Sequence, residues 1–126
     1  MKRLWVGICI LAVILILGAT VTGYTDSIQA HIIHHIRLAE DAAQVGQWEE
    51  AAGMLFRARG YWMQRQHLVA SVSDHEPMEE AESLFAQLEI YLKAKDATAF
   101  SACCAALQAT VRAIGEAHGV SWWNIL

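Results

Sequence analysis

The chain opens with an unbroken run of apolar residues and then changes to a regular alternation of apolar and polar positions. Residues 4–22 carry no charge, and 15 of these 19 residues are Ala, Val, Ile, Leu, Trp or Cys. As a helix, the run would measure about 28 Å, close to the hydrocarbon thickness of a bilayer (about 30 Å). A helix also satisfies its own backbone polar groups, which lipid cannot do. The pattern therefore predicts a membrane-spanning helix.

The charges that flank the run predict its orientation. Lys2 and Arg3 precede it, whereas Asp26 follows it and the next basic residue is Arg37. Basic residues favour the cytoplasmic side of a membrane. We therefore expect a transmembrane anchor at residues 1–23 with a cytoplasmic N-terminus, and an extracytoplasmic helical domain at residues 24–126. This single-pass protein of the cytoplasmic membrane would contact the lipid bilayer through residues 4–22.

A cleaved signal peptide is the alternative interpretation of the same segment. Residues 21–23 (Val-Thr-Gly) are a possible cleavage site before Tyr24. However, the apolar run exceeds the roughly 7–15 residues of a signal-peptide core, which favours a retained anchor. Cleavage would instead produce a secreted helical protein.

Beyond residue 24, apolar residues recur every three or four positions, which is typical of amphipathic helices. No segment shows the alternation of a β-strand. The spacing predicts four helices, at about residues 25–45, 48–73, 78–95 and 97–117. The expected inward positions are, helix by helix, Ile28, Ile32, Ile36, Ala39 and Ala43; Trp48, Ala52, Leu55, Arg59, Trp62 and Val69; Met78, Ala81, Leu84, Phe85, Leu88 and Leu92; and Phe100, Cys103, Leu107, Val111 and Ile114.

Four residues are expected to set the helix boundaries. Gly46 ends the first helix and Gly119 the fourth, because glycine adopts a left-handed conformation at low cost. Pro77 separates the second helix from the third, and Asp96 caps the start of the fourth. Since the connections are short, we expect an all-α fold in which an antiparallel four-helix bundle follows the transmembrane helix. Whether the first helix of this bundle continues the membrane helix is left open.

The segment over residues 39–58 resembles part of a tetratricopeptide unit, with Gly46, Trp48, Ala51 and Leu55 at matching offsets. One hairpin is not an array, so the expectation is a helical hairpin that is only weakly tetratricopeptide-like.

A second resemblance extends over the whole chain and rests on the order of several features. The chain begins with basic residues and one apolar segment, followed by a Gly-x-Trp-Glu-x-Ala hairpin (Gly46, Trp48, Glu49 and Ala51) and an aromatic residue (Trp62). A charged turn at residues 74–76, a helix junction at residues 92–96 and the final residues 124–126 complete the order. In this order the chain resembles the domain-of-unknown-function 4363 family, small membrane-anchored proteins of Firmicutes. The resemblance implies a bacterial, membrane-anchored helical module and supplies no catalytic residue.

Composition narrows the functional classes. Apolar residues make up 56% of the chain, which excludes a disordered protein. The net charge is −4, and past Gly23 there are 13 acidic and 7 basic residues, so no basic surface for nucleic acid is expected. No serine lies in a nucleophile elbow and no glycine-rich loop could cradle a phosphate. We expect no enzyme, no catalytic residue and no cofactor.

Three histidines form the sharpest local cluster. His31 and His35 are one helical turn apart, and His34 is adjacent. Imidazoles at this spacing can hold Zn²⁺ when other helices supply further ligands, but no partner motif is evident. We expect the cluster to border the core, with a metal site or a pH-responsive contact as the alternatives.

Two of the three cysteines are neighbours in the sequence. Cys103 and Cys104 are adjacent on one helix, so they cannot easily form a disulfide with each other. Cys103 is expected in the core, and Cys104 is a candidate for an intermolecular disulfide.

At the C-terminal end, an apolar group is expected to cap the bundle, with membrane or partner contact as the alternative. Its members are Trp122, Trp123, Ile125 and Leu126.

An anchor with no catalytic set favours a binding or scaffold module, which would act on a partner protein of unknown identity at the outer face of the membrane. The alternative function is a metal- or pH-responsive sensor built on His31, His34 and His35.

Overall fold

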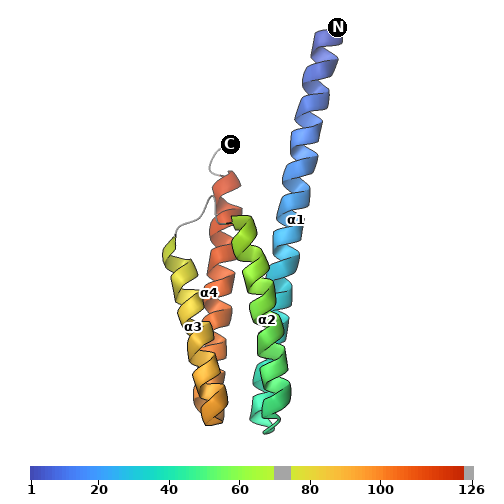
Figure 1. Ribbon diagram of the computed structural model, residues 1–126. Helices are drawn as coiled ribbons and strands as arrows, with labels where there is room; N and C mark the ends of the chain where they lie inside the picture. Colours follow the sequence, from blue (N-terminus) through green and yellow to red (C-terminus); the bar gives the residue numbers. More distant parts are fainter. Residues whose placement is uncertain (70–74, 124–126) are drawn as a thin grey trace.

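The computed structural model describes the backbone of residues 1–69 and 75–123, and the side chains of these residues except 21, 22, 24–26, 68, 69, 75 and 117–123. This part of the chain consists of four α-helices: α1 (Lys2–Gln44), α2 (Trp48–Val69), α3 (His75–Ala94) and α4 (Ala97–Trp123) (Figure 1). It contains no β-strand. The prediction of an all-α fold is confirmed.

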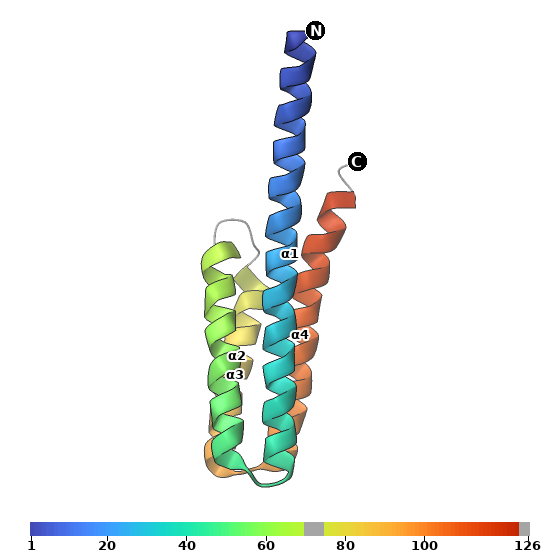
Figure 2. The same ribbon diagram turned by 90° about the vertical axis from the view of Figure 1, so that its right-hand side faces the viewer.

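The longest helix, α1, is continuous over 43 residues. Its N-terminal half stands clear of the other helices, whereas its C-terminal half packs against α2 and α4 (Figures 1 and 2). The membrane segment and the first amphipathic helix, whose connection the sequence left open, are therefore one helix. Gly18 and Gly23 do not interrupt it.

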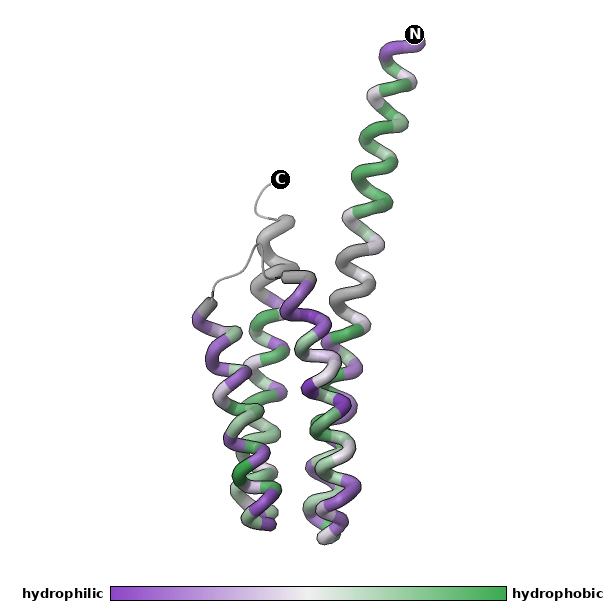
Figure 3. Tube along the Cα trace, viewed as in Figure 1, coloured by the Kyte–Doolittle hydropathy of each residue, from purple (hydrophilic) through white to green (hydrophobic). Residues whose placement is uncertain are grey.

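Beyond Lys2 and Arg3, the projecting half of α1 is apolar over most of its described length (Figure 3). Lys2–Thr20 is long and apolar enough to cross a bilayer, and none of it is buried. An exposed apolar surface of this size is costly in water. The window Ala97–Glu116 of α4 passes the same test of length and composition, but it is 39% buried and supplies part of the core. The exposure of the first segment therefore indicates association with a membrane.

Consecutive helices run in opposite directions (Figure 2). α1 packs against α2 and α4, and α3 packs against α4, while the contact between α2 and α3 is less extensive than these three. The predicted inward positions of α1 and α4 are all buried, and those of α3 are buried or half-buried. The largest fully buried side chains are Trp62, Phe85, Phe100, Ile32, Ile36, Leu88, Leu107, Val111 and Cys104.

The inward stripe of α2 differs from the prediction. Leu55 and Trp62 are buried as expected, but Ala51 and Ala58 are buried in place of Ala52, and Arg59 lies at the edge. Small side chains at the contact let α1 and α2 pack closely, which a count of bulky apolar residues does not reveal. The predicted side chain of Val69 lies outside the described residues.

Two helices end in the same hydrogen-bonded motif. After α1, Gly46 has φ +79°, its N–H bonds to the carbonyl of Ala43 and the next N–H bonds to that of Ala42. After α3, Lys95 has φ +52° and the equivalent bonds reach Leu92 and Tyr91. Both are Schellman motifs, in which one residue adopts the left-handed conformation. The predicted stop at Gly46 is confirmed, and a lysine performs the same role at the other turn.

For the last two helices, one predicted boundary is confirmed and two are wrong. The carboxylate of Asp96 accepts a hydrogen bond from the N–H of Ala99 at 3.1 Å, so the predicted N-cap is confirmed. α3 begins at His75, not at residue 78, because Pro77 lies in the first turn, where its missing N–H is not needed. α4 continues past Gly119 to Trp123, so the prediction that this glycine ends the helix is wrong. The predicted end of α2 at residue 73 lies outside the described residues.

Candidate functional site

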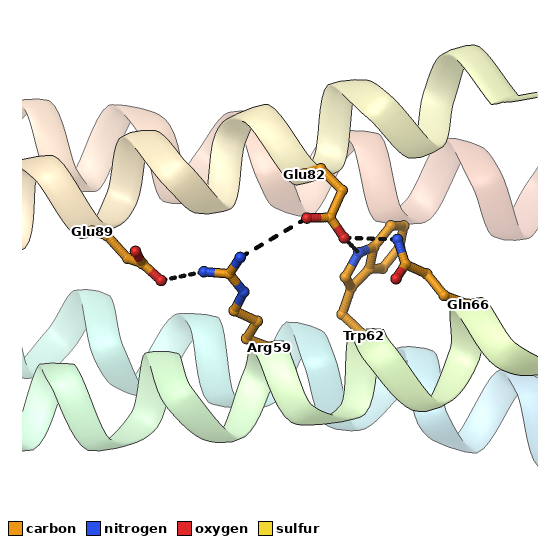
Figure 4. Close-up of polar contacts among 5 residues, drawn as sticks. All are labelled: Arg59, Trp62, Gln66, Glu82 and Glu89. Carbon is orange, nitrogen blue, oxygen red and sulfur yellow. Dashed lines mark hydrogen bonds and ion pairs between the residues drawn. The ribbon is translucent and has the colours of Figure 1, made fainter.

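A polar network bridges α2 and α3; we call it the α2–α3 seam (Figure 4). One Glu82 oxygen accepts hydrogen bonds from the indole N–H of Trp62 at 2.9 Å and from the amide of Gln66 at 2.7 Å. Arg59 lies 4.0 Å from the other oxygen and also pairs with Glu89. Both carboxylates are thus already bound to groups of α2. This arrangement joins the two helices through side chains.

The contact between α1 and α4 is polar at three levels. The hydroxyl of Ser101 donates to the carboxylate of Glu40, and Arg37 donates to Gln108 at 3.3 Å. Nearer to the projecting half of α1, the amide of Gln29 lies directly over Gly115, where a Cβ atom would be 2.1 Å from its oxygen. The missing side chain of this glycine therefore makes room for Gln29 in the interface between the two helices.

The three histidines lie at the contact between α1 and α2. His31 stacks on the ring of Tyr61 with centroids 5.0 Å apart, and His35 lies 5.3 Å from the same ring. The Nδ1 atom of His35 is 2.7 Å from the carbonyl oxygen of His31. His34 touches His35 edge-on and is exposed. The cluster borders the core as expected, through a tyrosine that the sequence pattern did not pair with it.

Among the side chains that the structure describes, no group of three or more His, Cys, Asp or Glu residues is placed to hold a metal ion. His31, His34 and His35 come close to one another, but the groups around them are an aromatic ring and a backbone carbonyl. Tyr61 contacts the rings of His31 and His35 from another helix.

The thiols of Cys103 and Cys104 are buried beside α1 and α3. Burial raises the pKa of both, and the nearby charge of Glu40 raises the pKa of Cys104 further. Cys103 donates to the carbonyl of Leu84 at 3.5 Å. Cys103 is a core residue as predicted, whereas the hypothesis of an intermolecular disulfide through Cys104 is wrong, because this side chain is fully enclosed.

An apolar face of α2 is exposed and uncovered. Phe56 is 80% exposed and Met63 is 51% exposed. Between and beside them lie Gly53 and Gly60, and a Cβ atom at either glycine would meet nothing within 4 Å. We call these four residues the α2 outer face. Neither glycine is therefore covered by another helix among the described residues.

This face is the feature that sequence reasoning missed. Its members recur at intervals of three, four and three residues, the spacing of one seam of a coiled coil. This spacing is visible in the sequence. However, α2 has two apolar stripes, and the stripe that contains Trp62 is sufficient to explain how α2 packs into the core, so the second stripe was not recognised.

The C-terminal apolar group falls at the end of α4 and beyond it. The backbone of α4 is described as far as Trp123, but the side chains of Trp122 and Trp123 and all of Ile125 and Leu126 lie outside the described residues. Whether this group caps the helices thus stays a prediction.

Comparison with known proteins gives one result. The family model "Domain of unknown function (DUF4363)" matches residues 19–125. Neither the curated proteins nor the solved structures searched contain a match to the chain. Since the family match covers most of the chain, from the end of the apolar segment almost to the last residue, the protein belongs to the DUF4363 family.

Proposed function

We propose that the protein is a single-pass membrane scaffold without enzymatic activity, which binds a partner protein through the α2 outer face. The observation that carries the proposal is the exposure of Phe56 and Met63 on a helix whose opposite side is packed into the core. Exposed apolar patches of this kind mark interaction sites.

The anchor is residues 1–23, with the N-terminus in the cytoplasm, and residues 24–126 form an antiparallel four-helix bundle on the outer side. Lys2 and Arg3 at the start of α1 support this orientation, and the full exposure of Lys2–Thr20 supports insertion in lipid. The alternative, a secreted protein after cleavage, predicts a mature chain that begins at Tyr24. Mass spectrometry of the protein from isolated membranes separates the two, because only the anchored form retains Lys2 and Arg3.

The occupant of the α2 outer face is a helix of the partner. The four residues follow a coiled-coil spacing, and alternating glycines leave depressions on either side of Phe56 into which side chains of an approaching helix fit. Met63 adds a flexible apolar side chain that adapts to the surface it meets. No charged residue belongs to this face, so association would depend on apolar burial and close helix approach.

Site-specific photocrosslinking tests the proposal. A photoreactive amino acid replaces Phe56 or Met63 in the full chain, and Ile90, which is 62% exposed on α3, serves as the matched control. In membranes of cells that make the protein, the first two positions should give an adduct of the same size that contains a second, different protein, and Ile90 should not. Gly60→Gln, which fills a depression without touching the core, should remove that adduct.

Two outcomes contradict the proposal. Adducts of equal yield from all three positions would show unspecific contact, and absence of any adduct at Phe56 and Met63 would show that the face has no partner. An adduct that contains only a second copy of this chain would replace the scaffold with self-association.

The sensor remains the alternative proposal, and the stack of His31 on Tyr61 is the observation that favours it. His31 and His35 both lie against Tyr61, so a ligand that binds these imidazoles would act on the contact between α1 and α2. Zinc titration of the full chain by calorimetry tests the metal-dependent form. Absence of saturable binding, or binding that persists in His31→Gln/His35→Gln, would remove it.

A further inference from the structure

We propose that the C-terminal end of α4 is a second membrane contact, in the interfacial region of the bilayer that α1 spans. The proposal rests on the anchor proposed above and goes beyond it, since it fixes the height and tilt of the four helices relative to the lipid. The observation behind it is the register between α1 and α4.

Three contacts define that register. Ser101 pairs with Glu40, and Gln108 with Arg37. Gly115 lies under Gln29. Progress along α4 toward its C-terminus is therefore matched by progress along α1 toward its N-terminus, as antiparallel helices of equal rise require.

The register places the end of α4 at the boundary of the apolar segment. Seven residues beyond Gly115 is Trp122, and seven residues before Gln29 is Thr22, the last residue of the uncharged run. With the scatter of the three contacts, the α4 backbone ends level with about residues 18–22 of α1. If α1 spans the bilayer with this run, the last turn of α4 cannot avoid the headgroup region.

α4 reaches this level beyond α3. The Cys103 contact with Leu84 places His75, the first residue of α3, nine residues from that contact and thus level with about residue 112 of α4. Figures 1 and 2 show α4 extending past the ends of both α2 and α3, beside the projecting half of α1. The last turns of α4 therefore have no α3 alongside to cap.

The residues at this end are suited to lipid. The last charged residue of the chain is Glu116, and residues 117–126 contain no Asp, Glu, Lys or Arg. Val120, Trp122 and Trp123 lie in the last two turns of α4. Tryptophan is enriched at membrane–water interfaces, where its ring is apolar and its N–H can still reach a polar group. The last two turns of α4 thus have the amino-acid composition that is typical of segments in the interfacial region of a bilayer.

A second contact would restrict the bundle as well as hold it. A single helix lets the attached domain rotate and tilt, whereas two points of contact define its orientation. The α2 outer face would then be presented at a constant angle to the membrane, which favours a partner held in the same membrane.

Depth-dependent quenching tests the inference with the full chain in phosphatidylcholine vesicles. The background is Cys9→Ser, in which the two remaining native thiols, Cys103 and Cys104, are buried and escape labelling. A nitrobenzoxadiazole label is attached at Ser121→Cys, at Leu11→Cys within the anchor, or at Glu49→Cys at the far end of α2. Quenching is then measured with lipids that carry a doxyl group near the headgroup or near the chain end.

We expect the label at residue 121 to be blue-shifted and quenched most by the shallow doxyl group, that at residue 11 to be quenched most by the deep one, and that at residue 49 by neither. Trp122→Ser/Trp123→Ser should reduce the quenching at residue 121 and leave that at residue 11 unchanged.

The possible failures are distinguishable. Quenching at residue 11 without quenching at residue 121 overturns the inference and leaves the anchor standing. A blue shift at residue 121 that no doxyl lipid quenches also overturns it, because the segment would then be covered by protein. Absence of quenching at residue 11 overturns the anchor, and with it the inference.

Discussion

The indole N–H of Trp62 donates a hydrogen bond to Glu82 across the α2–α3 seam, so the largest buried side chain of α2 depends on a carboxylate of α3. Glu82→Ala would leave a buried N–H without its acceptor, at a cost of about 1–3 kcal/mol. Because the Glu82 side chain is 38% exposed, we expect a loss near the lower end of that range. Chemical denaturation of the full chain in detergent measures it.

Two further variants separate the hydrogen bond from the ion pairs. Glu89→Ala breaks only the more exposed pair with Arg59 and should change stability by less than about 1 kcal/mol. Trp62→Phe/Glu82→Ala should lose less than the sum of its single changes, because both remove the same bond. Additive losses would show that Trp62 and Glu82 are not coupled.

The left-handed residue after α3 should be open to improvement. Lys95 has φ +52°, a conformation that costs a residue with a Cβ atom about 1–2 kcal/mol, whereas glycine adopts it freely. Lys95→Gly should therefore raise the free energy of unfolding by about 1 kcal/mol, since part of the gain is offset by the greater freedom of the unfolded chain. The matched change Gly46→Ala, at φ +79°, should lower it by a similar amount. If both substitutions changed the free energy of unfolding by the same amount and in the same direction, the left-handed conformation of residues 46 and 95 would be contradicted.

Much of this fold could be predicted from the sequence because most of its helices have only one apolar stripe. In α1 and α4, the inward positions recur without competition, from Ile28 to Ala43 and from Phe100 to Ile114, and all of them are buried. Gly46 and Asp96 act through local backbone geometry, which depends on a few neighbouring residues. Such features need no knowledge of the tertiary structure.

The wrong predictions concern positions whose burial or backbone conformation depends on the tertiary structure around them. α2 carries two apolar stripes, and only the position of α1 decides that Ala58 is buried and Phe56 is not. Pro77 and Gly119 disfavour helix, yet Pro77 falls in the first turn of α3 and Gly119 lies inside α4. The partner of His31 is likewise set by packing, because Tyr61 is thirty residues away in the sequence.

Three of the glycines within helices, two in α2 and one in α4, should respond differently to alanine. Gly53 and Gly60 face open space, so Gly53→Ala and Gly60→Ala should each stabilise the protein by about 0.5–1 kcal/mol through helix propensity. Gly115→Ala should not, because its Cβ would displace the amide of Gln29 and weaken the hydrogen bond that Arg65 donates to it at 3.4 Å. Gln29→Ala in the same chain should restore the gain. Thermal unfolding of the four variants measures this, and an equal gain at all three glycines in the parent chain would rule out the close contact.

The buried cysteines predict a decline of stability at alkaline pH. Their pKa values in the folded protein are raised above the ordinary value of 9.0 by burial, and for Cys104 also by Glu40. Below pH 9 both thiols are protonated in the folded and unfolded chains, so this stabilisation is fully present. Above that pH the unfolded thiols ionise while the folded ones do not, so the free energy of unfolding falls by up to about 1.4 kcal/mol per pH unit for each thiol.

Comparison of Cys9→Ser with Cys9→Ser/Cys104→Ala isolates this effect from the other groups that titrate at high pH. The second protein should be less stable near neutral pH, because a buried side chain is shortened, but its stability should fall less steeply above about pH 9, where only one thiol remains. In Cys9→Ser the two thiols should also resist an aromatic disulfide reagent until denaturant is added, since the thiolate is the reactive form and both are enclosed. Identical pH slopes in the two proteins, or rapid reaction of the folded chain, would place Cys104 outside the core.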